Sequence, residues 1–106
     1  MKPRIMLITL GVDDVERSVR FYRDGLGLKT EGIIGTQFEY GAVAFFELQT
    51  GLKLALWPRT SIARDTGIPL CSPSPTDFTI AHNVSSKLEV DAIMQQAASA
   101  GAVVVK

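Results

Sequence analysis

The fold of this chain is decided by residues 8–22, which read ITLGVDDVERSVRFY. The surrounding run Ile5–Val12 is apolar and rich in β-branched residues, which predicts a buried strand. Asp13 stands three residues before Glu16, the spacing of a capping box at the start of a helix. Apolar residues then recur at helical spacing and mark one face of the predicted helix: Val15, Val19, Tyr22 and Leu26.

Three further strands are expected after Gly25 and Gly27, which end the helix. Their approximate ranges are Lys29–Ile34, Phe38–Gln49, with a bend at Gly41, and Leu52–Pro58. The Thr-Gly pair at 50–51 is typical of a hairpin turn between the last two strands. Residues 59–76 are rich in Pro, Ser and Thr, which predicts a linker with a short helical turn near Ile62–Arg64.

The opening pattern returns after this linker. Phe78–Val84 reads as a strand, and Ser86 stands three residues before Glu89 in a second capping box. The apolar face of the helix that follows comprises Val90, Ile93, Met94, Ala97 and Ala98. Gly101 closes that helix, and Ala102–Val105 predicts the beginning of another strand.

The same order of elements in both halves predicts an internal duplication, although chance similarity of two capped helices is the alternative. Residues 1–58 then form a first βαβββ module, 59–76 the linker and 77–106 a second module that is truncated after its helix. The expected fold is α+β, with paired βαβββ modules around a mixed, largely antiparallel sheet. The strands missing from the second module would leave an open hydrogen-bonding edge on its sheet. Either the polypeptide is a fragment or truncated form, or a partner chain covers that edge, and on the second interpretation we expect a homodimer.

Composition narrows the class of protein. The 106 residues fit one domain, and 11 basic and 11 acidic side chains cancel. A net charge of zero favours neither nucleic acid nor an anionic membrane surface as partner. No apolar run approaches the ~20 residues of a membrane span. The single Cys71 excludes an internal disulfide and is typical of a reducing compartment, so a cytoplasmic location is expected.

Two stretches resemble the vicinal-oxygen-chelate superfamily, which contains glyoxalases, bleomycin-resistance proteins and extradiol dioxygenases. Residues 8–22, followed by Gly-Leu-Gly-Leu at 25–28, are similar to the family's opening signature. Residues 81–84, through Glu89-Val90-Asp91 to Ala100-Gly101-Ala102, are similar to the start of its second module. The resemblance implies paired modules whose sheet curls into a groove. In many members this groove holds a metal ion that a small organic substrate chelates through two vicinal oxygens.

The family's metal ligands are two His and two Glu, and this chain departs from that pattern. The first His position falls on Leu7, the first Glu on about Ala55 and the second His on Thr79, while the last Glu would lie beyond Lys106. Leu and Ala cannot ligate a metal and Thr is a poor ligand. We therefore expect no metal and no other cofactor. A divalent metal belongs to the alternative hypothesis below.

The resemblance and the alternation of side chains between the two faces of a strand together indicate which side chains face the expected groove. The predicted ligand-binding residues are Leu7, Thr9, Phe46, Ala55, Trp57, Thr79 and Asn83. Arg59 is expected at the groove rim. His82, the only histidine, lies on the other face of its strand, and a lone His makes neither a triad nor a metal cage. No catalytic residue is predicted.

Three functional hypotheses follow. The first is a metal-free module that binds a small, partly aromatic molecule in the groove, as drug-sequestering relatives do. The second is an enzyme, a lactoylglutathione-lyase-like or ring-cleaving protein that uses a divalent metal. The third is a protein whose dimer matters more than any ligand.

Overall fold

The structure is a computed structural model that describes residues 1–105. In chain order the elements are β1 (Leu7–Val12), α1 (Val15–Val19), the π-helical η1 (Arg20–Gly25), β2 (Thr30–Ile34), β3 (Val43–Glu47), β4 (Lys53–Pro58), α2 (Arg59–Thr66) and α3 (Lys87–Ser99). No helix within these residues is long and apolar enough to cross a membrane. The predicted order of strand, helix and three strands is confirmed for the first half of the chain.

The four strands form one mixed sheet in the order β1-β4-β3-β2. β1 runs parallel to β4, and the other two pairs are antiparallel. Gly51, with a φ of 83°, makes the predicted hairpin turn between β3 and β4. β3 is shorter than predicted because residues 35–41 form turns instead of a strand, closed by hydrogen bonds from Phe38 N–H to the Gly35 carbonyl and from Gly41 N–H to the Phe38 carbonyl.

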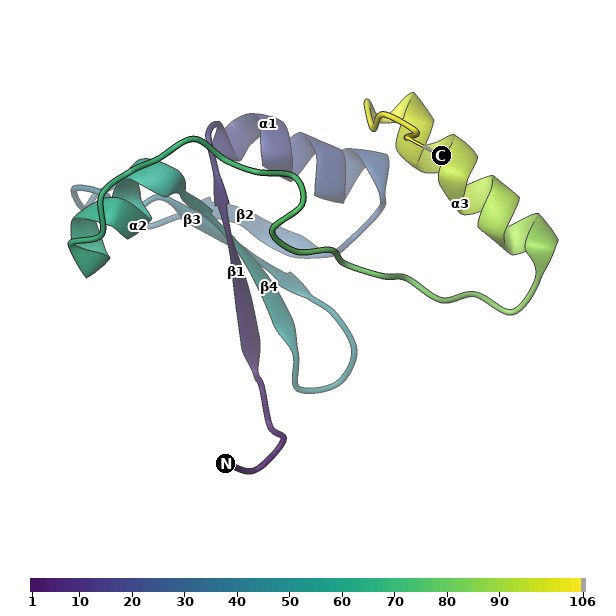
Figure 1. Cartoon of the computed structure of the whole chain (residues 1–106), viewed down its shortest axis with the longest axis horizontal. Coiled ribbons are helices and arrows are strands. Elements are labelled where there is room, and N and C mark those ends of the chain that lie inside the picture. Colours follow the sequence, from purple (N-terminus) through teal and green to yellow (C-terminus); the bar gives the residue numbers. More distant parts are fainter. Residues whose placement is uncertain (106) are drawn as a thin grey trace.

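The core lies between α1 and one face of the sheet. Its buried apolar residues are Val15, Val19, Ala44, Phe46, Leu54 and Leu56. Tyr22 on η1 closes the edge of this core, with its ring centroid 5.9 Å from that of Phe46. Burial raises the pKa of the Tyr22 hydroxyl. α1 covers this face, while α2 lies at one end of the sheet (Figure 1). There α2 packs on the opposite face, since Gly11, which shares a face with Leu7 and Thr9, is nearest to Arg59 and Ile62.

The helix caps confirm one prediction and correct the other. Ser86 caps α3, and its hydroxyl accepts a hydrogen bond from the Glu89 N–H at 3.2 Å. At α1 the cap is Asp14, not Asp13: the Asp14 carboxylate accepts from the Arg17 N–H at 3.1 Å. Asp13 is displaced from the cap because the helix begins one residue later than its spacing to Glu16 suggests.

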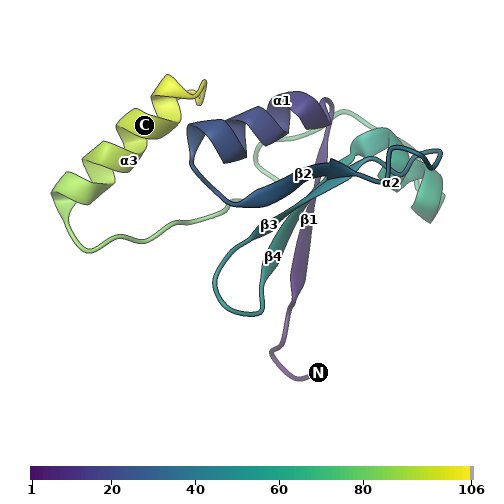
Figure 2. The same ribbon diagram turned by 180° about the vertical axis from the view of Figure 1, so that it is seen from behind.

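The second half differs most from the prediction. Phe78–Val84 and Ala102–Val105 form no strand, and Phe78 and Ile80 are 59% and 58% exposed. A strand needs a hydrogen-bonded neighbour, and within residues 1–105 no other strand pairs with either segment. The predicted helical turn after β4 is the longer helix α2. Both views show α3 beside the end of η1 and away from the sheet (Figure 2), where Gln96 Nε2 donates to the Gly25 carbonyl at 2.9 Å.

Candidate functional site

The face of the sheet opposite α1 carries a concavity of about 280 Å³, here called the open-face groove. Its lining residues come from β1, β3, β4 and the turn before β3: Leu7, Thr9, Gly41, Val43, Phe45, Ala55 and Trp57. Strand register explains this set, because residues paired across neighbouring strands share one face. Ala55 is paired with Thr9 on one side and with Phe45 on the other, and so forms the floor of the groove.

Charged residues lie at the end of the groove nearest the β3–β4 hairpin. Lys53 is paired with Leu7 across β1 and with Glu47 across β3. The Lys53 ammonium lies 3.3 Å from the Glu47 carboxylate, and both side chains are more than half exposed. The groove therefore changes from charged to apolar along the strands.

The other end is closed by Trp57 and the residues before β3. Trp57 Nε1 donates a hydrogen bond to the Tyr40 carbonyl at 3.1 Å. Tyr40 has a φ of 59° in the left-handed region, which is uncommon for a bulky residue. The guanidinium carbon of Arg64 on α2 lies 5.3 Å from the Tyr40 ring centroid, a cation–π arrangement.

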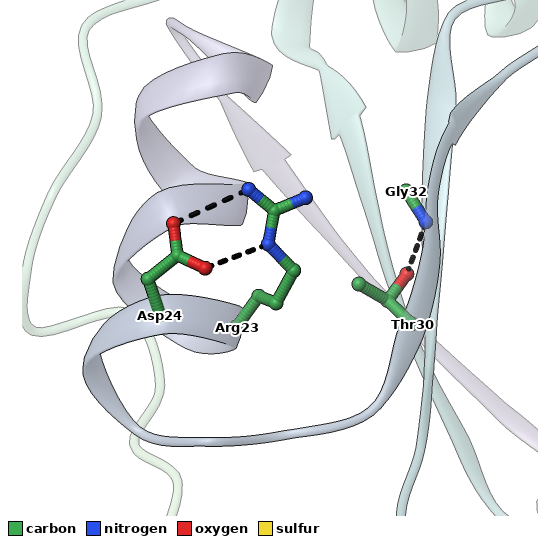
Figure 3. Close-up of polar contacts among 4 residues, drawn as sticks. All are labelled: Arg23, Asp24, Thr30 and Gly32. Atoms are coloured by element: carbon green, nitrogen blue, oxygen red, sulfur yellow. Dashed lines mark hydrogen bonds and ion pairs between the residues drawn. The ribbon is translucent and has the colours of Figure 1, made fainter.

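A bulge in β2 shapes the outer edge of the same face. Thr30 is paired with Phe46 and Ile33 with Ala44, so two residues of β2 face the single residue Phe45. The Thr30 hydroxyl donates to the Phe45 carbonyl at 2.6 Å. It accepts from the Gly32 N–H at 3.1 Å, the bond drawn in Figure 3. Gly32, with a φ of 92°, provides the backbone conformation that the bulge requires. This anchoring fixes the backbone that carries the Phe45 ring.

The structure brings together four of the seven predicted groove residues: Leu7, Thr9, Ala55 and Trp57. Phe46 is not among them. It points to the opposite face and is fully buried in the core, because the pairing of Phe45 with Ala55 places Phe45 on the groove side instead. Counting outward from a two-residue turn at 50–51 would pair Phe46 with Ala55. The loop that forms has three residues, 49–51, between the hydrogen-bonded Leu48 and Leu52, and it shifts the pairing by one residue.

The remaining predicted residues lie elsewhere. Thr79 and Asn83 are exposed in the segment between α2 and α3 and do not line the groove, since the strand expected to carry them is not formed. His82 is exposed in the same segment. Arg59 lies at the start of α2, with its guanidinium 3.1 Å from the Asp13 carboxylate and a hydrogen bond to the Cys71 carbonyl. Arg59 therefore contacts the segment between α2 and α3 through Cys71, and it is not among the residues that line the groove.

The residues present do not fit the family's metal. Leu7 and Ala55, where the resemblance puts two of the family's ligands, both line the groove, and neither side chain has a donor atom. Within residues 1–105 no three His, Cys, Asp or Glu side chains come together in a way that could hold a metal ion. The polar side-chain groups among the lining residues are the Thr9 hydroxyl and the Trp57 indole N–H, and the N–H is bonded to the Tyr40 carbonyl.

A larger concavity of about 730 Å³ lies among η1, the start of α2 and the end of α3. Two ion pairs lie at it, Arg59 with Asp13 at 3.1 Å and Asp24 with Arg23 at 2.8 Å (Figure 3). Asp14, Arg17 and Arg20 also line it. The hydrogen bond from Arg23 lowers the pKa of Asp24, and the same bond raises the pKa of Arg23. The carboxylates at this concavity, Asp13, Asp14 and Asp24, are exposed and offer no acid, base or nucleophile in a sheltered setting, so the open-face groove is the better candidate site.

Comparisons with known proteins agree with this fold. The family model described as Glyoxalase/Bleomycin resistance protein/Dioxygenase superfamily matches residues 4–106. A solved glyoxalase-related enzyme from Fulvimarina pelagi is 31% identical with a TM-score of 0.75, over 93% of this chain and 66% of that one. A glyoxalase/bleomycin resistance protein/dioxygenase from Nocardioides is 31% identical with a TM-score of 0.68, over 95% and 64%.

Two weaker likenesses show the fold alone. A hypothetical protein from S. aureus is 23% identical with a TM-score of 0.77, over 100% of this chain and 76% of that one. Lactoylglutathione lyase from Agrobacterium tumefaciens is 21% identical with a TM-score of 0.53, over 92% and 69%. A search of curated proteins found no match. This chain spans 66% of the Fulvimarina pelagi chain and 64% of the Nocardioides chain. On the match of the family model along residues 4–106, the chain belongs to the glyoxalase/bleomycin resistance protein/dioxygenase superfamily.

Proposed function

We propose that the chain binds a small, flat, largely apolar organic molecule in the open-face groove, without a metal ion. The observation that carries the proposal is the convergence of Phe45 and Trp57 around Ala55, where the resemblance puts a ligand and the chain has no donor atom. A volume of about 280 Å³ lies just below the range of roughly 300–1,000 Å³ for small-molecule sites, which favours a ligand with a single ring.

The lining residues favour binding over catalysis. Aromatic side chains hold a flat ligand by offset or edge-to-face contact, and Ala55 leaves room for it on the floor. The Thr9 hydroxyl orients a polar substituent by one hydrogen bond. Lys53 and Glu47 at the far end neutralise each other in solvent, which makes them weak candidates for acid–base chemistry. The alternative, a metal-dependent lyase or dioxygenase, needs ligands that these positions do not carry.

The test uses the fluorescence of Trp57, which is the only tryptophan and lies in the proposed site. Purified protein is titrated with phenol and with other single-ring compounds, with and without EDTA, and its metal content is measured in parallel. We expect saturable quenching that EDTA does not change. Thr9→Val keeps the shape of the side chain and removes the hydroxyl, and should weaken binding of phenol by about 2- to 10-fold.

Two results would contradict this proposal. One is a stoichiometric metal ion whose removal abolishes binding. The other is an absence of quenching with every single-ring compound in protein that is folded by circular dichroism.

We also propose that the chain forms a homodimer. It exposes 8455 Å², whereas a compact monomer of 11.5 kDa exposes about 5,800 Å². The surplus of about 2,700 Å² is enough for a large obligate interface. It includes apolar side chains of the β1 segment, such as Met6 at 73%, and of α3, such as Leu88 at 81%. Light scattering should give about twice 11.5 kDa, and a stable monomer at tens of micromolar would refute the dimer.

A cytoplasmic location is part of the same proposal. It is supported by the single Cys71, which is exposed and forms no disulfide. Fractionation of cells that express the full chain tests it, and recovery in a secreted or periplasmic fraction would contradict it.

A further inference from the structure

The segment Gly35–Gly41, here called the end loop, forms one wall of the open-face groove. Gly41 lines the groove directly, and the Tyr40 carbonyl accepts the hydrogen bond from Trp57 Nε1 at 3.1 Å. The indole N–H is a donor only, so this bond restrains the plane of the Trp57 ring in addition to its packing. The loop therefore determines where the apolar end of the groove stops.

Three features show that the conformation of the end loop depends on its neighbours. Gly35 and Gly41 lie so close that a Cβ on either one would overlap the carbonyl of the other. Tyr40 adopts the left-handed conformation with a φ of 59°, which costs energy for a bulky residue and persists only when neighbours maintain it. The Arg64 guanidinium on α2, 5.3 Å from the centroid of the Tyr40 ring, is such a neighbour.

We propose that Tyr40 is a positioning residue that sets ligand length. Through its carbonyl it orients Trp57, and through its ring it ties the end loop to Arg64 on α2. Trp57 and the end loop then bound one end of the groove, and Lys53 and Glu47 lie beyond its other end. A ligand inserts one aromatic ring against Trp57 and extends its polar part toward the charged end. This inference rests on the proposed function for the identity of the ligand, although the positioning of Trp57 can be tested without one.

The ligand-free test measures collisional quenching of Trp57 fluorescence by acrylamide. Tyr40→Gly keeps the carbonyl and allows the positive φ but removes the ring that Arg64 holds, so the loop loses its anchor. We expect the quenching constant to rise about twofold, and Arg64→Gln to act in the same direction. Glu39→Ala, an exposed neighbour in the same loop, is the matched control and should leave the constant unchanged. Equal quenching in wild type and in both variants would overturn the proposal.

The ligand test compares phenol with 2-naphthol, one ring with two, by calorimetry. Wild type should prefer phenol, and Tyr40→Gly and Trp57→Phe should each shift the ratio of affinities toward 2-naphthol by about tenfold. Trp57→Phe keeps an aromatic ring and removes the N–H donor. If wild type binds neither probe, the proposed function fails while the quenching result still decides the role of Tyr40. If both probes bind and the ratio moves less than twofold in both variants, the length-setting role fails alone.

Discussion

Phe45 and Phe46 are neighbours in β3 that point to opposite faces of the sheet, so the same substitution at each has different consequences. Phe46 is 0% exposed beneath α1, and Phe46→Ala removes a full ring from the core. Such a change costs about 3–5 kcal/mol in free energy of unfolding. Phe45 is 37% exposed on the groove face, where no closed cavity can form, so Phe45→Ala should cost about 1 kcal/mol of cross-strand contact.

Urea unfolding followed by circular dichroism measures both variants against wild type, with the slope of the transition as a check on two-state behaviour. The loss caused by Phe46→Ala is a large part of the free energy of unfolding of a small domain, which is typically ~5–15 kcal/mol. Phe46→Leu is the milder variant if the alanine variant does not fold. Phe45→Ala should instead weaken phenol binding, which Trp57 fluorescence reports. Equal destabilisation by the two alanine substitutions, or loss of binding without loss of stability at position 46, would refute the assignment of faces.

Three further predictions concern local structure. Asp14→Ala removes the α1 cap and should lower the free energy of unfolding in urea by about 1 kcal/mol. Asp13→Ala removes only an exposed ion pair with Arg59 and should lower it by less. The reverse order would contradict the cap assignment. Gly51→Ala should cost about 1 kcal/mol, because the turn holds a φ of 83°, and an unchanged midpoint would argue against that turn. Burial raises the pKa of Tyr22, so the phenol contributes stability that is fully present below its ordinary pKa of about 10 and is lost as pH rises through the higher folded value. Tyr22→Phe should abolish this alkaline loss in unfolding curves, and an identical pH profile in the variant would show that another group causes it.

The sequence by itself determined those features that depend on neighbours along the chain. The cap of α3 at Ser86, the hairpin turn at Gly51 and the run from β1 through β4 follow from side chains within a few residues of each other. The cap of α1 was predicted one residue early because Asp13 and Asp14 are chemically equivalent candidates and only the backbone geometry separates them.

Only the tertiary structure decided which face each strand residue occupies and which segments find a partner. Phe46 enters the core because the register of β3 on β4 sends Phe45 to the groove, and a shift of one residue exchanges the two faces. Phe78–Val84 has the composition of a strand, yet a strand exists only when another lies beside it, and none does within residues 1–105. The contact of Trp57 with Tyr40 joins residues 17 positions apart through a backbone carbonyl, which no side-chain pattern records. Residues 8–22 thus predict a strand and a helix from local chemistry, while the groove depends on long-range pairing that only the folded chain establishes.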